Sequence, residues 1–239
     1  MKTVLRRAFT AVLIALGAQQ ALAQPVNGCP AGYAMQSSDP SGRRVTCVQI
    51  TETDIIGRWA VTGTTKCLQA TGGFSTQSFS PLISTAPTSV SQLAGTFIGT
   101  RTFYAGGTGH SVGTSHTLTF PATVYSTGAP PVGGGTGGAS VATLDASFTW
   151  SIQSNGMLLI DDDNSIAQPF TAPPSLLGQT VTIENVPSFA GYISKDMRTI
   201  ELTHPGMSLE TSIRRNASGV EQSRTPRYCA RSRVLTRLP

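Results

Sequence analysis

The sequence is poor in aromatic residues and has no long apolar segment beyond its N-terminus. Only 7% of its 239 residues are aromatic, so its two tryptophans are informative about where a core forms. No segment after residue 23 approaches the roughly 18 apolar residues that a transmembrane helix requires. We therefore expect no transmembrane segment in the mature protein.

Helical periodicity and metal-binding spacings are also missing. Helix-forming residues at a 3.6-residue spacing are nearly absent, which argues against folds that alternate helices and strands. None of the four cysteines forms a C-x-x-C pair, and no histidine lies near two of them, so a zinc site is not expected. We expect no cofactor and no bound metal.

The first 23 residues have the three parts of a secretory signal peptide. A basic region precedes an apolar run over residues 8–18, and an Ala-Leu-Ala cleavage sequence follows at residues 21–23. The apolar run is too short for a bilayer core of about 30 Å, although an uncleaved anchor is the alternative. We expect cleavage after Ala23 and a secreted or periplasmic protein.

Removal of the signal peptide changes the charge of the chain. The full sequence carries seventeen basic and twelve acidic residues, a net charge of +5. Loss of Lys2, Arg6 and Arg7 leaves fourteen basic residues and a net charge of +2. Because most of the basic excess belongs to the signal peptide, no nucleic-acid partner is expected.

A local excess of positive charge remains near the C-terminus. Five arginines occur within fourteen residues: Arg224, Arg227, Arg231, Arg233 and Arg237. The last four share one face if this segment is a strand, because side chains alternate with period 2. We expect that face to be a solvated outer surface, with a patch that binds an anion or lipopolysaccharide as the alternative.

The four cysteines, Cys29, Cys47, Cys67 and Cys229, all lie in the mature chain. An even number of cysteines in an exported protein predicts two disulfides, with three connectivities. Residues 24–54 read as a cysteine-bounded hairpin, because a Ser-Asp-Pro-Ser-Gly turn separates two short strand-like pieces. A Cys29–Cys47 bond across this hairpin is the simplest expectation.

Residues 55–239 are predicted to form an all-β domain. Thr, Ser, Val and Ile dominate, and Gly and Pro separate the runs. About eight to ten antiparallel strands follow one another at regular spacing, which is typical of an up-and-down barrel or a sandwich. Residues 128–139 are rich in glycine, and we expect them to form a flexible loop without a binding role.

The domain begins with Gly57-Arg58-Trp59, a G-x-W motif at the head of an alternating run. Together with the strand pattern, this motif resembles the lipocalins and the wider calycin group. The resemblance implies that Trp59 packs across the closed end of a barrel and that Arg231 or Arg233 stacks over it. The family's Thr-Asp pair is absent, and a buried tryptophan in another all-β fold is the alternative.

A closed barrel also makes a prediction about the remaining cysteines. Its first strand, which carries Cys67, must pair with its last strand, which carries Cys229, or the sheet has free edges. We therefore predict a Cys67–Cys229 disulfide between residues 162 positions apart.

Inward-facing aromatic and aliphatic residues are the candidates for a ligand site in such a barrel. The clearest alternation runs through Phe148, Trp150 and Ile152, and Phe97 and Phe103 join them from an earlier strand. These residues would line a cavity for one small apolar or amphipathic molecule. Ordinary core packing is the alternative for all five.

One motif suggests catalysis. Residues 109–113 fit the G-x-S-x-G pattern with Ser111 as nucleophile, and the aspartates at 161–163 and His204 follow in the order of hydrolase partners. That motif requires a strand before the serine and a helix after it, whereas glycines precede Ser111 and β-branched residues follow. We therefore favour a Gly-rich hairpin turn.

Other polar groups are weaker candidates. The acidic run at 161–164 lacks the ligand spacing of a calcium loop, and His110, His116 and His204 are widely scattered. The sequence thus favours an exported, non-catalytic binding protein whose partner is a small hydrophobic ligand. A structural or interaction module of the cell envelope, with an envelope component as partner, is the alternative, and a Ser111 hydrolase comes third.

Overall fold

The computed structural model describes residues 33–38, 45–71, 74–75, 82–83, 89–121, 137–162, 166–194 and 196–239. Within these ranges the chain is almost entirely β-strand, and all strand pairs are antiparallel, which confirms the all-β prediction. The signal peptide, Cys29 and most of the 128–139 segment lie outside the described residues. The only α-helix there is α1 (Glu52–Ile55), and no described helix is long and apolar enough to cross a membrane.

Two small sheets stand apart from the main one. Strands β1 (Tyr33–Ser38) and β2 (Val45–Gln49) pair as an antiparallel hairpin within the predicted N-terminal extension. Strands β4 (Phe74–Ser75) and β5 (Leu82–Ile83) pair over two residues each.

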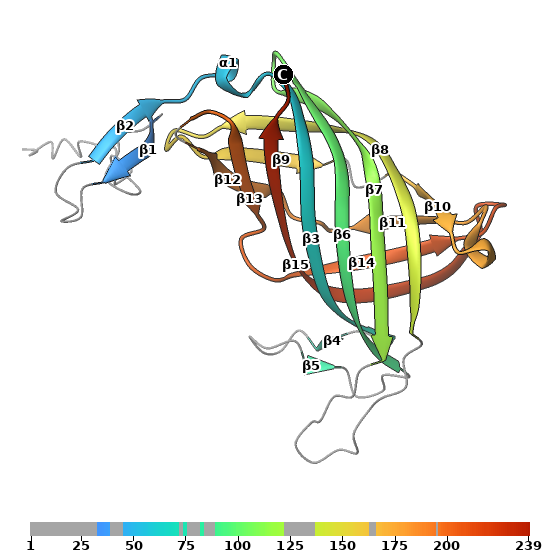
Figure 1. The fold of residues 1–239 in the computed structure, drawn as a ribbon. Coiled ribbons are helices and arrows are strands. Elements are labelled where there is room, and N and C mark those ends of the chain that lie inside the picture. The colour runs from blue at the N-terminus through green and yellow to red at the C-terminus, as the bar shows by residue number, and fades with distance from the viewer. Residues whose placement is uncertain are drawn as a thin grey trace, which may run out of the picture.

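Five long strands form one continuous wall of the main sheet (Figure 1). In spatial order they are β15 (Glu221–Arg237), β3 (Gly57–Thr71), β6 (Ser89–Tyr104), β7 (Thr108–Pro121) and β8 (Gly138–Ile152). Their inward and outward positions alternate, because successive side chains of a strand point to opposite faces.

Six short strands close the wall on itself in two groups. The β9 group contains β9 (Leu158–Asp162), β12 (Phe189–Ile193) and β13 (Thr199–Thr203), and it joins the C-terminal part of β8 to that of β15. The β10 group contains β10 (Gln168–Ala172), β11 (Thr180–Glu184) and β14 (Ser208–Arg215), and it joins the N-terminal parts of the same two strands.

Each group completes a ring of eight strands with the five long ones, so the main sheet has eleven strands rather than the eight to ten expected. A short 3-10 turn, η2 (Pro174–Leu176), connects β10 to β11. The order also departs from a simple meander, because the chain passes from β9 to the β10 group, returns for β12 and β13, and leaves again for β14.

The half of the ring closed by the β9 group is filled. Fifteen buried apolar side chains pack together there: Ile50, Ile55, Trp59, Val61, Phe97, Phe103, Phe148, Trp150, Leu158, Ile160, Phe189, Ile193, Ile200, Leu202 and Leu235. The ring of Phe103 makes edge contacts with Trp59, Phe148 and Trp150, with centroids 5.0–6.4 Å apart. These contacts add to the hydrophobic gain from burying four aromatic side chains.

Trp59 is completely buried at the end of this core. Its indole N–H donates a hydrogen bond of 2.8 Å to the carbonyl of Ile55, at the end of α1. Gly57 precedes it with a φ of +128°, a conformation that side-chain-bearing residues rarely adopt. The glycine therefore sets the conformation at the start of β3, and the tryptophan packs into the core directly after it.

The predicted Cys67–Cys229 disulfide is confirmed. The two residues are direct cross-strand partners in the β3–β15 pair, and their Cα atoms are 4.1 Å apart. The bond therefore links the strands that come first and last in the sequence of the main sheet, β3 and β15, across 162 residues of chain. Cys47 is also disulfide-bonded, but its expected partner Cys29 lies outside the described residues.

Candidate ligand-binding cavity

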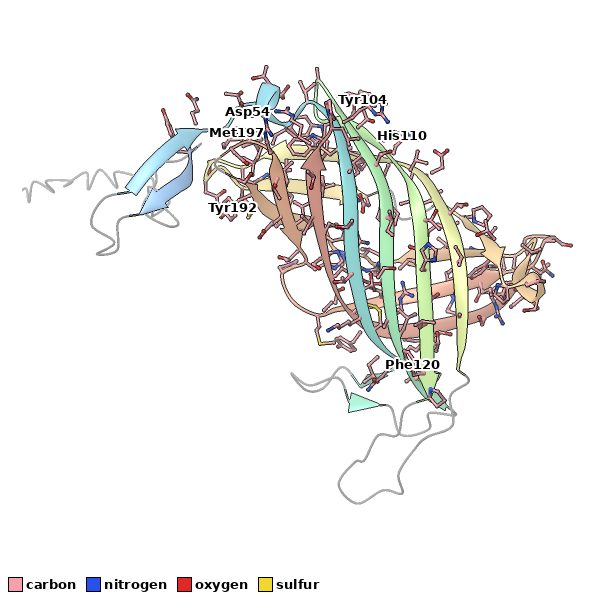
Figure 2. All side chains as sticks on the ribbon, in the orientation of Figure 1. Asp54, Tyr104, His110, Phe120, Tyr192 and Met197 are labelled. Carbon is pink, nitrogen blue, oxygen red and sulfur yellow. A yellow bond between two sulfur atoms is a disulfide. The ribbon has the colours of Figure 1, made fainter. Side chains whose placement is uncertain are left out.

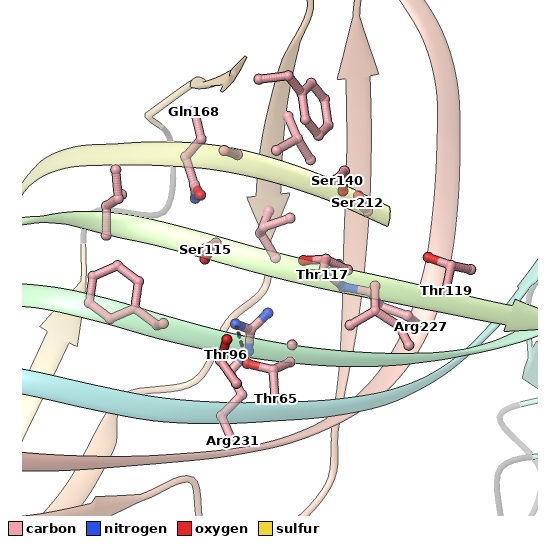
Figure 3. Close-up of a pocket in the computed structure, with 18 of the residues that line it drawn as sticks. Thr65, Thr96, Ser115, Thr117, Thr119, Ser140, Gln168, Ser212, Arg227 and Arg231 are labelled. Atoms are coloured by element: carbon pink, nitrogen blue, oxygen red, sulfur yellow. Dashed lines mark hydrogen bonds between the residues drawn. The ribbon is translucent and has the colours of Figure 1, made fainter. Parts of the chain in front are cut away.

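The half of the ring closed by the β10 group contains a cavity of about 540 Å³. Small polar side chains from many strands line it, as the close-up shows (Figure 3). They include Thr65, Thr96, Ser115, Thr117, Thr119, Ser140, Gln168 and Ser212. Apolar side chains from β6, β8, β10 and β11 line other parts of its wall: Leu93, Leu144, Phe170, Val181 and Ile183.

The cavity exists because the inward side chains of the long strands are small at the cavity and large in the core. On β8 the inward series begins with small residues at the cavity and ends with aromatic ones in the core: Ser140, Ala142, Leu144, Ala146, Phe148 and Trp150. Tyr104 and His110 mark the filled end of β6 and β7, and Phe120 marks the other end (Figure 2). Side-chain size therefore decides which half of a continuous wall is packed.

Buried charged residues lie where the core meets the cavity and along the β15 wall of the cavity; we call them the charged layer, and the first is Arg101. This arginine is 1% exposed, and its Nη2 donates to both carboxylate oxygens of Asp162 at 2.7 Å. Its guanidinium also lies over the ring of Phe148, 5.0 Å from the centroid. The carboxylate of Asp162 is thus already held by one arginine.

Glu210 is the second buried carboxylate, with 0% exposure. It accepts hydrogen bonds from Nε and Nη2 of Arg231 at 2.8 and 2.6 Å, and from Nη2 of Arg227 at 3.2 Å. Burial alone would raise the pKa of Glu210, but the hydrogen bond and charge of Arg231 hold it below the usual value. Burial and repulsion by Arg231 lower the pKa of Arg227 to about 10.

Arg233 differs from these residues because no carboxylate in the described part of the chain pairs with it. Its Nη1 donates only to the backbone carbonyls of Thr64 and Ser232. Its guanidinium lies over the rings of Phe97 and Phe189, 5.3 and 5.1 Å from the centroids. Burial, followed by repulsion from Arg231 and Arg101, lowers the pKa of Arg233 to about 9. It therefore stays charged at neutral pH.

His204 completes the layer as a neutral group. Its ring packs on Phe189 at a centroid distance of 4.2 Å, and neither ring nitrogen has a hydrogen-bond partner in the described structure. Burial, reinforced by the positive charges of Arg231 and Arg233, lowers the pKa of His204 to about 4. His204 therefore adds no charge to the layer at neutral pH.

The structure places the five residues predicted to bind ligand on both sides of this layer. Phe97 lines the cavity and also packs against the core. Phe103, Phe148 and Trp150 belong to the packed core, and Ile152 is partly buried against it. All five side chains point inward, as the alternation predicts. Phe103, Phe148, Trp150 and Ile152 do not line the cavity, so a binding role for them remains a prediction.

The arginine-rich strand corrects two expectations. The shared face of Arg227, Arg231 and Arg233 points inward, and Arg227 and Arg233 are 6% and 7% exposed, so it is not a solvated outer surface. The cation over Trp59 is Arg237, 4.9 Å from the ring, rather than Arg231 or Arg233. Those two arginines belong to the charged layer instead, where Arg231 bonds to Glu210 and Arg233 lies over Phe189.

The G-x-S-x-G motif lies within strand β7 rather than in a hairpin turn. Residues 105–107 form the turn, and Ser111 points inward from the strand with its Oγ buried and without a hydrogen-bond partner among the described residues. Because Ser111 has no hydrogen-bonded base among the described residues, these residues do not assemble an activated serine nucleophile.

The other polar candidates are dispersed. His110 bonds to Asp145 at 2.7 Å on the outer surface, where both side chains are exposed. Asp162 belongs to the charged layer, and residues 163–164 lie outside the described structure. Within the described ranges, no group of three or more histidine, cysteine or acidic side chains could hold a metal ion.

A signal for the inward arginines was present in the sequence. Trp59 and Cys67 are eight residues apart on one strand and therefore share a face. If Trp59 is inside, so are Cys67 and its disulfide partner Cys229, and with them the arginines two and four residues further on. The positions of Asp162 and Glu210 gave no comparable signal, because they depend on the register between separate strands.

Comparisons with known proteins add no identification. No family model matches the chain, and neither does any curated protein or solved structure.

Proposed function

We propose that the ring is a lipocalin-like β-barrel and that the protein is an exported, non-catalytic binding protein for a small amphipathic molecule. The observation that carries this proposal is the cavity of about 540 Å³, which has both polar and apolar walls. Its volume lies within the range of about 300–1,000 Å³ typical of ligand pockets. Small closed rings of about eight strands leave room for one such ligand.

Export is supported by the signal-like N-terminus and by the disulfide. A bond such as Cys67–Cys229 is typical of proteins that fold in an oxidising compartment. The alternative of an envelope interaction module drew on the arginine-rich last strand as a partner surface. Three of those arginines face inward, so this strand supports the binding proposal better.

A cavity-blocking variant tests the proposal with a matched control. Ser115 lines the cavity, whereas its neighbour Thr114 occupies an outward position on the same strand. We expect Ser115→Trp to abolish uptake of fluorescent probes such as N-phenyl-1-naphthylamine or 1-anilinonaphthalene-8-sulfonate, and Thr114→Trp to leave uptake unchanged. Native mass spectrometry of the protein purified from the exported fraction would also detect a co-purified small molecule. Failure of both probes to bind the wild-type protein, with no co-purified molecule, would contradict the proposal.

A further inference from the structure

The cavity is strongly unbalanced in charge. Five of its lining residues are arginines: Arg101, Arg214, Arg227, Arg231 and Arg233. Asp162 is the one described carboxylate that lines the cavity. Glu210 is fully buried and paired with Arg227 and Arg231. His204 is neutral at the same layer. The interior therefore carries an excess of positive charge.

Neither carboxylate is free to neutralise that excess. Asp162 is held at 2.7 Å by Arg101, and Glu210 accepts from both Arg231 and Arg227. Arg233 and Arg214 remain without a carboxylate partner in the described part of the chain, and Arg214 Nε is buried without a hydrogen bond. Of these two, Arg233 is the more deeply buried and lies at the inner end of the cavity, against Phe97 and Phe189.

We infer that the ligand is an organic anion and that its acidic group binds the guanidinium of Arg233. This inference rests on the proposed binding function. A buried guanidinium without a counter-charge is costly, and an arginine does not escape that cost by losing its proton at neutral pH. A carboxylate, sulfonate or phosphate would supply the missing charge through two parallel hydrogen bonds.

The remaining walls indicate how the rest of the ligand lies. Val181 and Ile183 of β11 provide apolar surface on the side of the cavity formed by the β10 group. The faces of Phe97 and Phe189 are already covered by Arg233, so the apolar part of the ligand extends from Arg233 toward the β10 group. An amphipathic anion, bound with its acidic group innermost, fits this arrangement.

Two probes of matched structure test the charge requirement. 1-Anilinonaphthalene-8-sulfonate differs from the neutral N-phenyl-1-naphthylamine only by its sulfonate. We expect the sulfonate probe to bind the wild-type protein at least about tenfold more tightly, since a charge-assisted hydrogen bond contributes at least that factor. Inorganic sulfate alone should compete weakly; if it binds as tightly as the sulfonate probe, the ligand is a free inorganic anion and the organic part of the inference is wrong.

Arg233→Gln then tests the residue, with Arg224→Gln as control because Arg224 lies on the same strand but is exposed. We expect Arg233→Gln to weaken the sulfonate probe about tenfold, to leave the neutral probe unchanged, and to keep or raise the Tm of the ligand-free protein. Arg224→Gln should change neither affinity.

Each other result overturns the inference. Equal binding of the two probes, or unchanged sulfonate binding in Arg233→Gln, would show that Arg233 does not hold an anion. A lower Tm or loss of folding in Arg233→Gln would make Arg233 a structural residue. If neither probe enters the wild-type cavity, the binding function itself fails, and the result is distinct from these.

Discussion

The two halves of the ring share the same five long strands but differ in how their interiors are filled. Toward the β9 group, inward positions carry aromatic and branched side chains that fill the interior. Toward the β10 group, the same strands carry Ser, Thr and Gly at inward positions and leave a cavity. The comparison shows that backbone closure and interior packing are separate properties of this fold, and that the second is set residue by residue.

The charged layer contacts both halves, because its residues line the cavity and its arginines lie over rings of the core. Its arginines use the aromatic rings of the core as supports, and its carboxylates orient those arginines. A fold that needed only stability would gain little from such a layer, since apolar residues of similar volume serve as well or better. The layer is therefore the feature of the architecture on which the proposed binding function depends most.

The largest expected effect lies in the filled half. Trp59→Ala should lower the free energy of unfolding by about 3–5 kcal/mol, because it empties a fully buried site and removes the hydrogen bond to Ile55. Chemical denaturation measures this difference. A loss below about 1 kcal/mol would mean that the filled half is not the stabilising core, and it would contradict the difference in packing between the two halves.

A slightly smaller effect is expected in the charged layer. Glu210→Gln leaves Arg227 and Arg231 buried without their shared counter-charge and should cost about 3 kcal/mol. Glu221→Gln is the matched control, because Glu221 pairs with Arg224 on the surface, and it should have little effect on unfolding. Equal effects of the two substitutions would indicate that the layer is open to water.

The acid stability of the protein should depend on His204. Its folded pKa of about 4 is below the unfolded value of 6.5, so the unfolded chain binds a proton in this range and the folded protein does not. The contribution of neutral His204 to the free energy of unfolding is therefore fully present above pH 6.5. It falls by about 1–3 kcal/mol as the pH drops toward 4.

His204→Phe isolates this contribution while keeping a ring against Phe189. The variant should lose much less stability than the wild-type protein between pH 6.5 and 4.5, measured by denaturation at each pH. Substitution of the exposed His110 by Gln serves as control and should follow the wild-type curve. If His204→Phe also follows the wild-type curve, His204 is hydrated in the folded state.

Some of this arrangement could be predicted from the sequence for clear physical reasons. The G-x-W motif marked the strand that enters the core, because the φ of Gly57 is one that residues with side chains rarely adopt and Trp59 is the large apolar side chain directly after it. The Cys67–Cys229 bond followed from closure alone, since a ring must join its first strand to its last. Both features depend on local conformation or on topology, which strand patterns carry.

The interior of the ring could not be predicted in the same way. Alternation showed that Arg227, Arg231 and Arg233 share a face, but charged residues are mostly exposed, and this rule assigned that face to solvent. The division of the six short strands into the β9 group and the β10 group was also missed, because short strands of similar composition do not reveal their pairing partners. The cavity depends on both, so its place did not follow from the pattern, and its charge would have required the shared parity of Trp59, Cys67 and Cys229 to outweigh the rule that charged residues are exposed.

The smallest expected effect lies at the cavity wall. Gly109 and Thr117 are inward positions on the same strand, one beneath the ring of Phe148 in the core and the other at the cavity. Gly109→Ala would force a methyl group against that ring and should cost about 1–3 kcal/mol, as overpacking of a filled core does. Thr117→Leu adds more volume but into open space, so its cost should stay below about 0.5 kcal/mol. Thermal and chemical denaturation of the pair measure the contrast, and the leucine should also weaken uptake of the sulfonate probe by occupying part of the cavity. A larger loss of stability for Thr117→Leu than for Gly109→Ala would show that the half closed by the β10 group is packed and that the two halves do not differ in packing.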